Sequence, residues 1–125
     1  MLFTPLSIGK LKLSNRIVVS PMCQYSALDG MMNDWHFQHL TQLGLSGAGL
    51  VMIESTAVEK TGRITNYCVG LYDDSCEKSI KSTLERVKSI SLPFSKFGIQ
   101  LGHAGRKAST QRPWEGRKFL KKEEN

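Results

Sequence analysis

The sequence predicts an α/β fold with a parallel sheet, in which strands and helices alternate along the chain. Three short apolar runs of strand length are separated by two segments with helical periodicity. The runs also lack the polar alternation of a sheet with one wet face, which is typical of strands covered on both sides. With 125 residues, of which 40% are hydrophobic, the chain is long enough for one domain with a modest core and too apolar for intrinsic disorder.

The first half of the chain contains a hairpin, a strand and a helix. Leu2–Leu13 alternates loosely around a central Gly-Lys pair, which predicts a short hairpin ahead of the main fold. The apolar run Arg16–Met22 predicts the first buried strand. Asn33 or Asp34 can then cap a helix that continues to the glycine-rich stretch Gly44–Gly49.

The second half repeats the pattern of strand, helix and strand. The run Gly49–Ser55 predicts a strand that is buried on both sides. Asp73 and Asp74 precede a helical pattern, and Glu77 lies three residues after Asp74, which predicts a carboxylate variant of the capping box. Phe97–Leu101 predicts a third buried strand. Such an order of elements predicts right-handed crossovers between parallel strands.

The positive charge is concentrated near the C-terminus. The chain carries a formal net charge of +6. Up to Ala104 there are 10 basic and 8 acidic residues, whereas 7 basic and 3 acidic residues follow from Gly105. Clustered Lys and Arg can neutralise phosphates, so nucleic-acid binding is one interpretation. Because no helix-turn-helix, zinc-finger or RNA-binding aromatic pattern accompanies the charge, we favour a solvated loop or tail and expect no nucleic-acid partner.

Cysteine usage and hydropathy bear on the compartment. The three cysteines, Cys23, Cys68 and Cys76, form no C-x-x-C pair, and we expect a reducing environment. The N-terminus turns polar before the apolar core of a signal peptide is complete. The longest apolar stretch, Gly47–Ile53, is far shorter than the roughly 18 residues that a membrane span needs. We therefore expect a soluble, cytoplasmic protein with no membrane partner.

Chemically active side chains follow the carboxyl end of each predicted strand. They are Ser20–Tyr25 after the first strand, Glu54–Ala57 after the second, and Gln100, His103, Arg106 and Lys107 after the third. In parallel α/β folds, loops from several strands converge at this end to build sites. Neither a G-x-G-x-x-G motif nor a P-loop is present, so the sequence does not predict the phosphate cradle of a dinucleotide fold.

Four strings in these regions carry a specific resemblance: SNRIVVSPMCQYS, ESTAV with GRIT, GIQLGHAGRKAS, and PWEG. Their order and spacing resemble the N-terminal part of the Old Yellow Enzyme family, which are FMN-dependent NAD(P)H oxidoreductases that reduce activated C=C bonds. The match runs from about Leu2 to about Gly116. The Cys of SPMC and the HAGRK string resemble the bacterial-type subclass, whose members carry Cys where others have Thr.

The resemblance implies a partial (β/α)8 TIM barrel, with an N-terminal hairpin, about three parallel strands and two helices. Residues 1–110 would form the N-terminal part of this flavin-binding barrel, and residues 111–125 a basic loop or tail that we expect to be disordered. The implied cofactor is FMN, with NAD(P)H as the reductant and a small enone-type molecule as the acceptor.

The resemblance also implies which residues bind the cofactor. The backbone around Ser20, Pro21 and Met22 would line the flavin ring, and Ala57 would pack near it. Gln100 would hydrogen-bond the pyrimidine side of the ring. An amide suits this role because it offers both a donor and an acceptor to an edge that presents both.

Two further residues are implied to act at the reactive edge. Cys23 would bind near the flavin, where a polarizable thiol can tune the redox potential and the fit of the substrate. Without its flanking residues, Cys23 would read as a buried structural thiol. Tyr25 would face the substrate and either hydrogen-bond a carbonyl or supply a proton. Taken alone, a Tyr after a strand is more often a packing residue with a solvated hydroxyl.

Other polar residues have competing interpretations. His36 and His39 have a spacing that can share a metal, but no third ligand accompanies them, and we expect no metal site. Glu54 ends a buried strand and needs a partner, so a structural ion pair is the leading interpretation. His103, Arg106 and Lys107 can contact the cofactor, the nicotinamide or another subunit, or can serve only to hold the loop in place.

A (β/α)8 barrel takes roughly 250 residues, and this chain supplies about three of its strands. Whether the chain is itself an enzyme is therefore uncertain, and we expect it to be inactive alone. The alternative is a non-catalytic fragment that docks onto a partner supplying the rest of the barrel. Its open sheet edge also predicts self-association.

Overall fold

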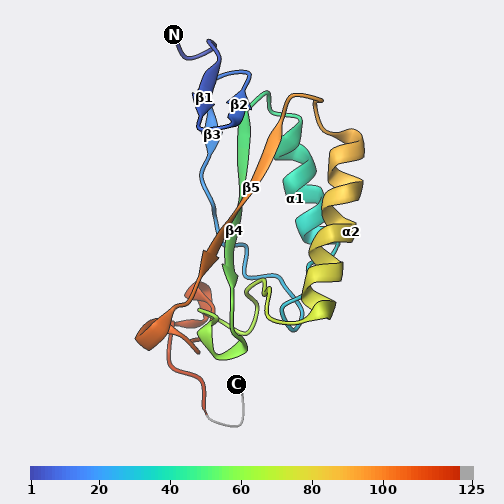
Figure 1. Ribbon diagram of the computed structural model, residues 1–125. Helices are drawn as coiled ribbons and strands as arrows, with labels where there is room; N and C mark the ends of the chain where they lie inside the picture. Colours follow the sequence, from blue (N-terminus) through green and yellow to red (C-terminus); the bar gives the residue numbers. More distant parts are fainter. Residues whose placement is uncertain (122–125) are drawn as a thin grey trace.

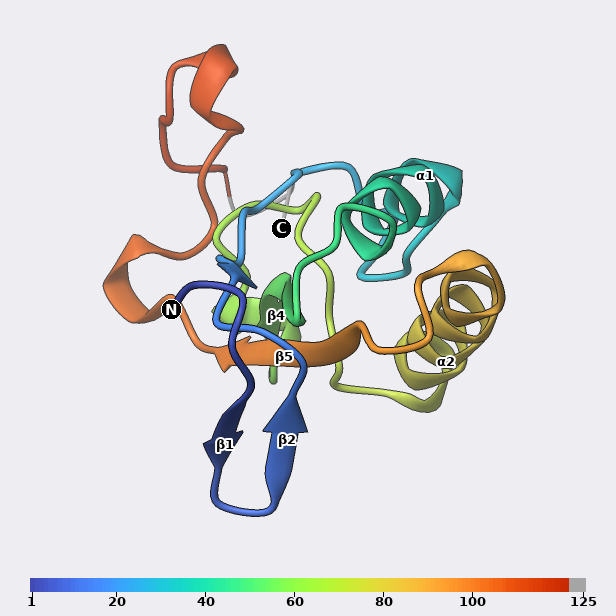
Figure 2. The ribbon, with the colours of Figure 1, turned by 90° about the horizontal axis from the view of Figure 1, so that it is seen from above.

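A three-stranded parallel sheet organises the chain, of which the computed structural model describes residues 1–121. Its order is β3–β4–β5, formed by Val18–Val19, Leu50–Ala57 and Lys96–Gly102. The helices α1 (Asp34–Gly44) and α2 (Asp74–Ile90) connect these strands, and both cover the same face of the sheet (Figures 1 and 2). Parallel strands joined by helices confirm the α/β prediction.

The predicted N-terminal hairpin is also present. β1 (Leu6–Ile8) pairs antiparallel with β2 (Leu11–Leu13). The turn between them requires a left-handed backbone at Gly9, with φ of +58°. In Figure 1 the hairpin lies beyond the amino ends of the parallel strands, where it forms a separate two-stranded ribbon. It therefore lies at the opposite end from the loops that follow β4 and β5.

β3 is much shorter than the strand predicted for Arg16–Met22. Only Val18 and Val19 pair with β4, and Val18 is 44% exposed at the edge of the sheet. Pro21 has no N–H to donate to a ladder, and the next residues bond elsewhere. The prediction of a long buried strand was wrong here, and residues 20–22 belong to a loop.

β4 is the central strand and contains a bulge. Ile53 pairs with Ile99 and Ser55 pairs with Gln100, so Glu54 is an extra residue between two ladder positions. Val51 and Ile53 face the helices and are buried. On the other face the side chains are only half-buried, because no described helix covers it.

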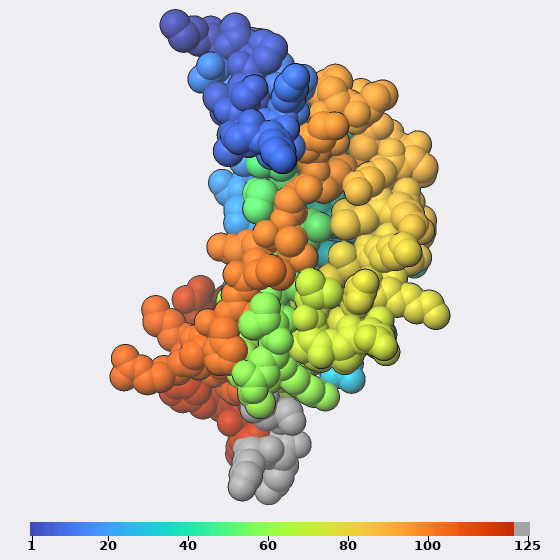
Figure 3. Space-filling model, in the orientation of Figure 1, coloured from blue at the N-terminus to red at the C-terminus, as the bar shows by residue number. Residues whose placement is uncertain are grey.

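β5 forms the second edge of the sheet. It is longer by a residue at each end than the predicted strand, and Gln100 and Leu101 are exposed, Leu101 by 55%. The space-filling view shows this strand at the surface along the middle of the molecule (Figure 3). The prediction that β5 is buried was therefore wrong.

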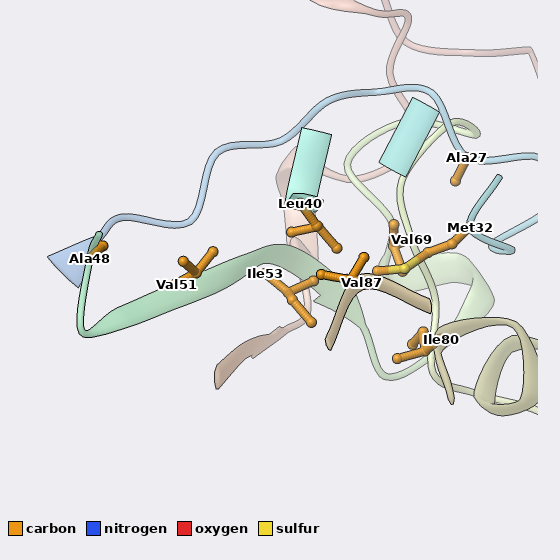
Figure 4. Close-up of a cluster of buried hydrophobic side chains, with 9 residues drawn as sticks. All are labelled: Ala27, Met32, Leu40, Ala48, Val51, Ile53, Val69, Ile80 and Val87. Carbon is orange, nitrogen blue, oxygen red and sulfur yellow. The ribbon is translucent and has the colours of Figure 1, made fainter. Parts of the chain in front are cut away.

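The hydrophobic core fills the space between the sheet and the two helices. Figure 4 shows its buried side chains: Ala27, Met32, Leu40, Ala48, Val51, Ile53, Val69, Ile80 and Val87. They come from β4, from both helices, from the loops that precede each helix and, for Ala48, from the connection between α1 and β4. Burial of this cluster fixes the helices against β4 and so determines where the strand ends lie.

Both helices begin at capped residues. The Asn33 side chain accepts from the Trp35 N–H and forms a capping box with His36. At α2 the cap is Asp73, which accepts from the Cys76 N–H at 2.8 Å. The next residue is already helical, so the predicted box formed by Asp74 was wrong. Within residues 1–121, neither helix is both long and apolar enough to cross a membrane.

The segment after β5 folds back beside the carboxyl ends of the strands (Figure 1). It contains two 3₁₀ turns, Gly105–Lys107 and Pro113–Glu115. Thr110 bridges Thr65 on one side and Phe119 on the other. Within the described part of this segment, the Gln111 N–H donates to the Lys118 carbonyl and the Leu120 N–H to the Ser109 carbonyl. Residues 122–125, the end of the predicted tail, lie outside the described residues, and the domain boundary at residue 110 stays a prediction.

Asn15 joins the beginnings of β3 and β4. Its side-chain oxygen accepts from the N–H groups of Ile17 at 3.0 Å and Gly49 at 2.9 Å, and its amide donates to the Gly47 carbonyl at 2.8 Å. A Cβ at Gly49 would lie 2.8 Å from the Asn15 carbonyl oxygen, so only glycine allows this approach. The buried side chain therefore sets where the two strands start relative to each other.

We expect Asn15→Ala to lower the free energy of unfolding by about 2 kcal/mol, because it leaves the partly buried Ile17 N–H and the Gly47 carbonyl without these partners and removes one of the two acceptors of the Gly49 N–H. Urea unfolding followed by circular dichroism measures the change. The exposed neighbour Ser14→Ala is the matched control and should leave the midpoint unchanged. Equal midpoints for both variants would contradict this role.

Candidate functional site

The carboxyl ends of β3, β4 and β5 lie side by side at one end of the sheet. Val19 is aligned with Val51, and Ala57 with Gly102, so the loop after β3 runs alongside the second half of β4. The Cys23 thiol reaches the backbone of Ser55 in this arrangement. The structure therefore brings together the three clusters that the sequence predicts at strand ends.

Glu54, the bulged residue of β4, connects the sheet to this loop. Its Oε2 accepts from the Gln24 N–H at 3.0 Å, and its Oε1 lies 3.4 Å from Nε2 of His36. Both side chains are almost fully buried. In the helix cap His36 Nδ1 accepts from the Asn33 N–H at 3.2 Å, and its Nε2 lies beside the carboxylate without a hydrogen-bond partner among the described residues.

The predicted partner for Glu54 is thus present, although the sequence did not identify it. The spacing of His36 and His39 is one that two metal ligands can have. In the structure His36 is instead part of the cap of α1 and lies beside Glu54. Burial lowers the pKa of His39, which is half-buried. Among the described residues no group of three or more His, Cys, Asp or Glu side chains could hold a metal ion.

Cys23 lies half-buried in the loop after β3, as a free thiol. Burial raises its pKa, and the neighbouring Cys68 and the Glu54 carboxylate raise it further. Hydrogen bonds from the Ser55 backbone and the Tyr25 side chain oppose this in part. The thiol is therefore protonated at neutral pH and adds no charge to the edge of the sheet.

Tyr25 occupies a left-handed backbone position, with φ of +49°. Its ring contacts that of Trp114 edge to face, with centroids 5.9 Å apart and an angle of 76° between the planes. Burial raises the pKa of its hydroxyl, which stays protonated at neutral pH. The PWEG string near the C-terminus therefore packs against the loop that follows the first strand.

A cavity of about 280 Å³ opens beside Tyr25. Arg106 and Lys107 from the loop after β5 line it, together with Arg117 from the C-terminal segment. His103 lies apart from this lining: its Nε2 is 3.2 Å from Glu59 Oε2, and its ring covers Gly62. The three polar residues that the sequence left undecided are thus divided between two locations.

Gln100 lies on the open face of the sheet. Along β5, Phe97 and Ile99 pack on the core, so alternation places Gln100 on the opposite face with Gly98 and Gly102. Its side chain is exposed and bonds no other described residue. Ala57, two pairs further along the ladder, is buried, and its backbone bonds the segment before α2 through Val69 and Leu71.

Comparison with known proteins identifies this arrangement. Residues 1–119 match the NADH:flavin oxidoreductase / NADH oxidase family. The chain belongs to this family. An NADH:flavin oxidoreductase of Gibberella zeae is 46% identical over 112 residues, which make up 90% of this chain and 26% of that protein.

Two further proteins of the group extend the comparison. An NADPH dehydrogenase of Bacillus subtilis is 41% identical over 112 residues, 88% of this chain and 32% of that protein. The structure of Old Yellow Enzyme from Pichia sp. matches with a TM-score of 0.76 and 25% identity, over 86% of this chain and 28% of that chain. The resemblance to Old Yellow Enzymes is confirmed, and the sheet with its helices is part of a TIM barrel.

The chain spans only 26% to 32% of the length of these relatives. Sequence reasoning placed the strand ends and their residues at one edge. It missed the link from Glu54 through Gln24 to the loop, and it missed the contact between Tyr25 and Trp114. The only local signal for the first was a carboxylate in an otherwise apolar run.

We expect the rate at which iodoacetamide alkylates Cys23 to rise with pH around a midpoint above that of an ordinary cysteine, because burial raises the pKa. Glu54→Gln removes a nearby negative charge but keeps an acceptor for the Gln24 N–H. Its midpoint should therefore move to lower pH. Mass spectrometry of the Cys23 peptide measures the rate.

Glu59→Gln is the matched control for this experiment, since it removes the same charge from an exposed position paired with His103. It should leave the Cys23 midpoint in place. An unchanged midpoint in Glu54→Gln, or an equal shift in both variants, would contradict the coupling between Glu54 and the thiol.

Proposed function

We propose that this chain forms one wall of the FMN site of an NAD(P)H oxidoreductase that reduces the activated C=C bond of an enone-type acceptor. The observation that carries the proposal is that the Ser20–Cys23 loop after β3, Ala57 at the end of β4 and Gln100 near the end of β5 lie at the same end of three adjacent parallel strands. Cofactor sites in such folds lie at the carboxyl ends of the strands. The names of the Gibberella and Bacillus relatives support flavin and nicotinamide chemistry.

The donor set at this edge fits a flavin ring. Gln100 presents an amide donor and acceptor on the open face, where described residues leave both unbonded, and the pyrimidine edge of a flavin needs both. The backbone at Ser20, Pro21 and Met22 is outside any ladder, and the Met22 carbonyl accepts from the Gln24 side chain at 2.9 Å. Ala57 adds no bulk beside it. These residues would hold the isoalloxazine, whereas nothing described here is assigned to the FMN phosphate.

FMN held by these residues would supply hydride transfer from NAD(P)H to the β-carbon of the acceptor. Tyr25 would orient the acceptor by donating a hydrogen bond to its carbonyl, or supply a proton. The raised pKa keeps the proton on its hydroxyl at neutral pH. Cys23, protonated for the same reason, would border the reactive edge as a neutral, polarizable group.

A second candidate function is docking onto a polypeptide that supplies the rest of the barrel. A groove of about 480 Å³ lies between α2 and β5, with Leu84, Phe97 and Ile99 at its floor and Lys81 and Glu85 at its rim. An amphipathic helix with charged flanks matches such a groove. The chain spans only a small share of its relatives' length, so the segments that supply the rest of the barrel are candidates for this occupant.

A cytoplasmic location stays a prediction.

The proposed function is tested in a chimera in which residues 1–119 replace the matching N-terminal segment of the Bacillus subtilis NADPH dehydrogenase. We expect the chimera to retain FMN and to oxidise NADPH with cyclohexenone as acceptor. The isolated chain should bind FMN weakly or not at all. Gln100→Leu in the chimera should weaken FMN binding about tenfold, since one polar contact is lost. Fluorescence titration of FMN measures the affinity.

Gln42→Leu, on the exposed side of α1, is the matched control and should leave FMN affinity unchanged. A folded chimera without bound flavin would refute the proposed function. Tight FMN binding by the isolated chain would instead show that the remaining strands are unnecessary.

The open edges predict concentration-dependent self-association of the isolated chain. We expect Leu101→Lys on β5 to reduce it, because a charge on an edge strand disfavours pairing between chains. Light scattering after size-exclusion chromatography measures the mass over a range of concentrations. Phe3, which is also exposed, lies in the N-terminal segment, and Phe3→Lys serves as the control. A monomer at all concentrations would contradict the prediction.

A further inference from the structure

The cavity beside Tyr25 has an unusual charge. Arg106, Lys107 and Arg117 line it, and no Asp or Glu does. None of the three forms an ion pair with any residue in the described part of the chain. The nearby acids are already engaged, Glu115 with Arg112 and Glu59 with His103. Three cations around one small space repel each other, and an anion bound between them would relieve this.

Apart from the amide of Gln111, whose buried Oε1 has no hydrogen-bond partner among the described residues, the rest of the lining is apolar or carries hydroxyls. Ile64, Pro113 and Phe119 provide apolar surface, and Thr65 and Thr110 lie among them. A ligand with an apolar body and one anionic group therefore matches the cavity better than a bare inorganic ion does. The body would lie against the apolar side chains while the charged group meets the basic ones.

The backbone around the cavity is held in uncommon conformations. Tyr25 and Arg117, which both line it, have positive φ angles of +49° and +56°, and so does Ser109, at +55°, next to Thr110. Non-glycine residues in this region cost conformational energy and persist where the surrounding structure imposes them. The positions of the Tyr25 ring and the Arg117 side chain are thus imposed by the fold rather than by local preference.

We propose that this cavity binds the carboxylate of a small, partly apolar acid, so that the acceptor of the proposed reaction carries a carboxylate as well as its activated C=C bond. The inference rests on the proposed function in one respect, the placement of Tyr25 at the acceptor. Arg106, Lys107 and Arg117 select the anion, and the apolar wall selects its body. A volume of about 280 Å³ suits an acid of this size but not a whole dinucleotide.

The test uses the full chain without flavin, and calorimetry with benzoate, the neutral isostere benzamide, and NADP⁺ as probes. We expect benzoate to bind, to bind more weakly as salt is raised, and to bind at least about tenfold more tightly than benzamide. Lys107→Gln and Arg117→Gln should each weaken benzoate binding about tenfold, since each removes a charged partner. Circular dichroism checks the fold of each variant.

Lys12→Gln is the matched control, because it removes one positive charge from the hairpin at the other end of the molecule. It should leave benzoate affinity unchanged. Equal affinities for benzoate and benzamide would overturn the proposal, and so would unchanged affinity in both Lys107→Gln and Arg117→Gln. Tighter binding of NADP⁺ that is lost in the same variants would also overturn it, by assigning the cations to a nucleotide phosphate.

The measurement does not involve flavin, so its outcome is separable from that of the chimera. Selective benzoate binding by a chain whose chimera lacks FMN would refute the proposed function and leave the anion site standing. A flavin-loaded chimera whose parent chain does not distinguish benzoate from benzamide would refute the anion site alone.

Discussion

The parallel pairing of β4 with β3 on one side and β5 on the other is the constraint on which the site depends. Parallel strands need crossovers, and both helices of this chain serve as crossovers on the same face of the sheet. As a result β3, β4 and β5 point the same way, and residues more than 70 positions apart, such as Cys23 and Gln100, come to one end of the sheet. The core between helices and β4 keeps that arrangement fixed.

The bulge at Glu54 then links the carboxyl end of β4 to the loop that contains Cys23 and Tyr25. An ordinary ladder position would point the carboxylate into one face or the other, whereas the extra residue lets it meet the Gln24 N–H and His36. A buried carboxylate is costly without partners. Its two contacts therefore tie β4, the first helix and the Cys23–Tyr25 loop into one unit.

Patterns within a few residues predicted most elements, and contacts across the chain explain what they missed. The Asn33 cap and the apolar run of β4 are local signals, and both helices and the hairpin followed from such signals. The length of β3 could not be predicted in this way, because it depends on where the chain leaves the ladder ahead of Pro21. The exposure of β5 could not be predicted either, because it depends on whether another strand or segment packs beside this edge strand. The contact between Tyr25 and Trp114 joins residues 89 positions apart, and no local pattern encodes it.

The basic C-terminal segment is the clearest case in which composition alone misleads. As a count of charges, it is compatible with a solvated tail or with a nucleic-acid contact. Phosphate backbones are bound by charges spread over an extended surface, whereas Arg106, Lys107 and Arg117 converge on one small cavity beside Tyr25. Convergent charge with apolar walls suits a single anionic group on a small molecule. Because Trp114 also packs on Tyr25, the described part of this segment lies against the loop after β3.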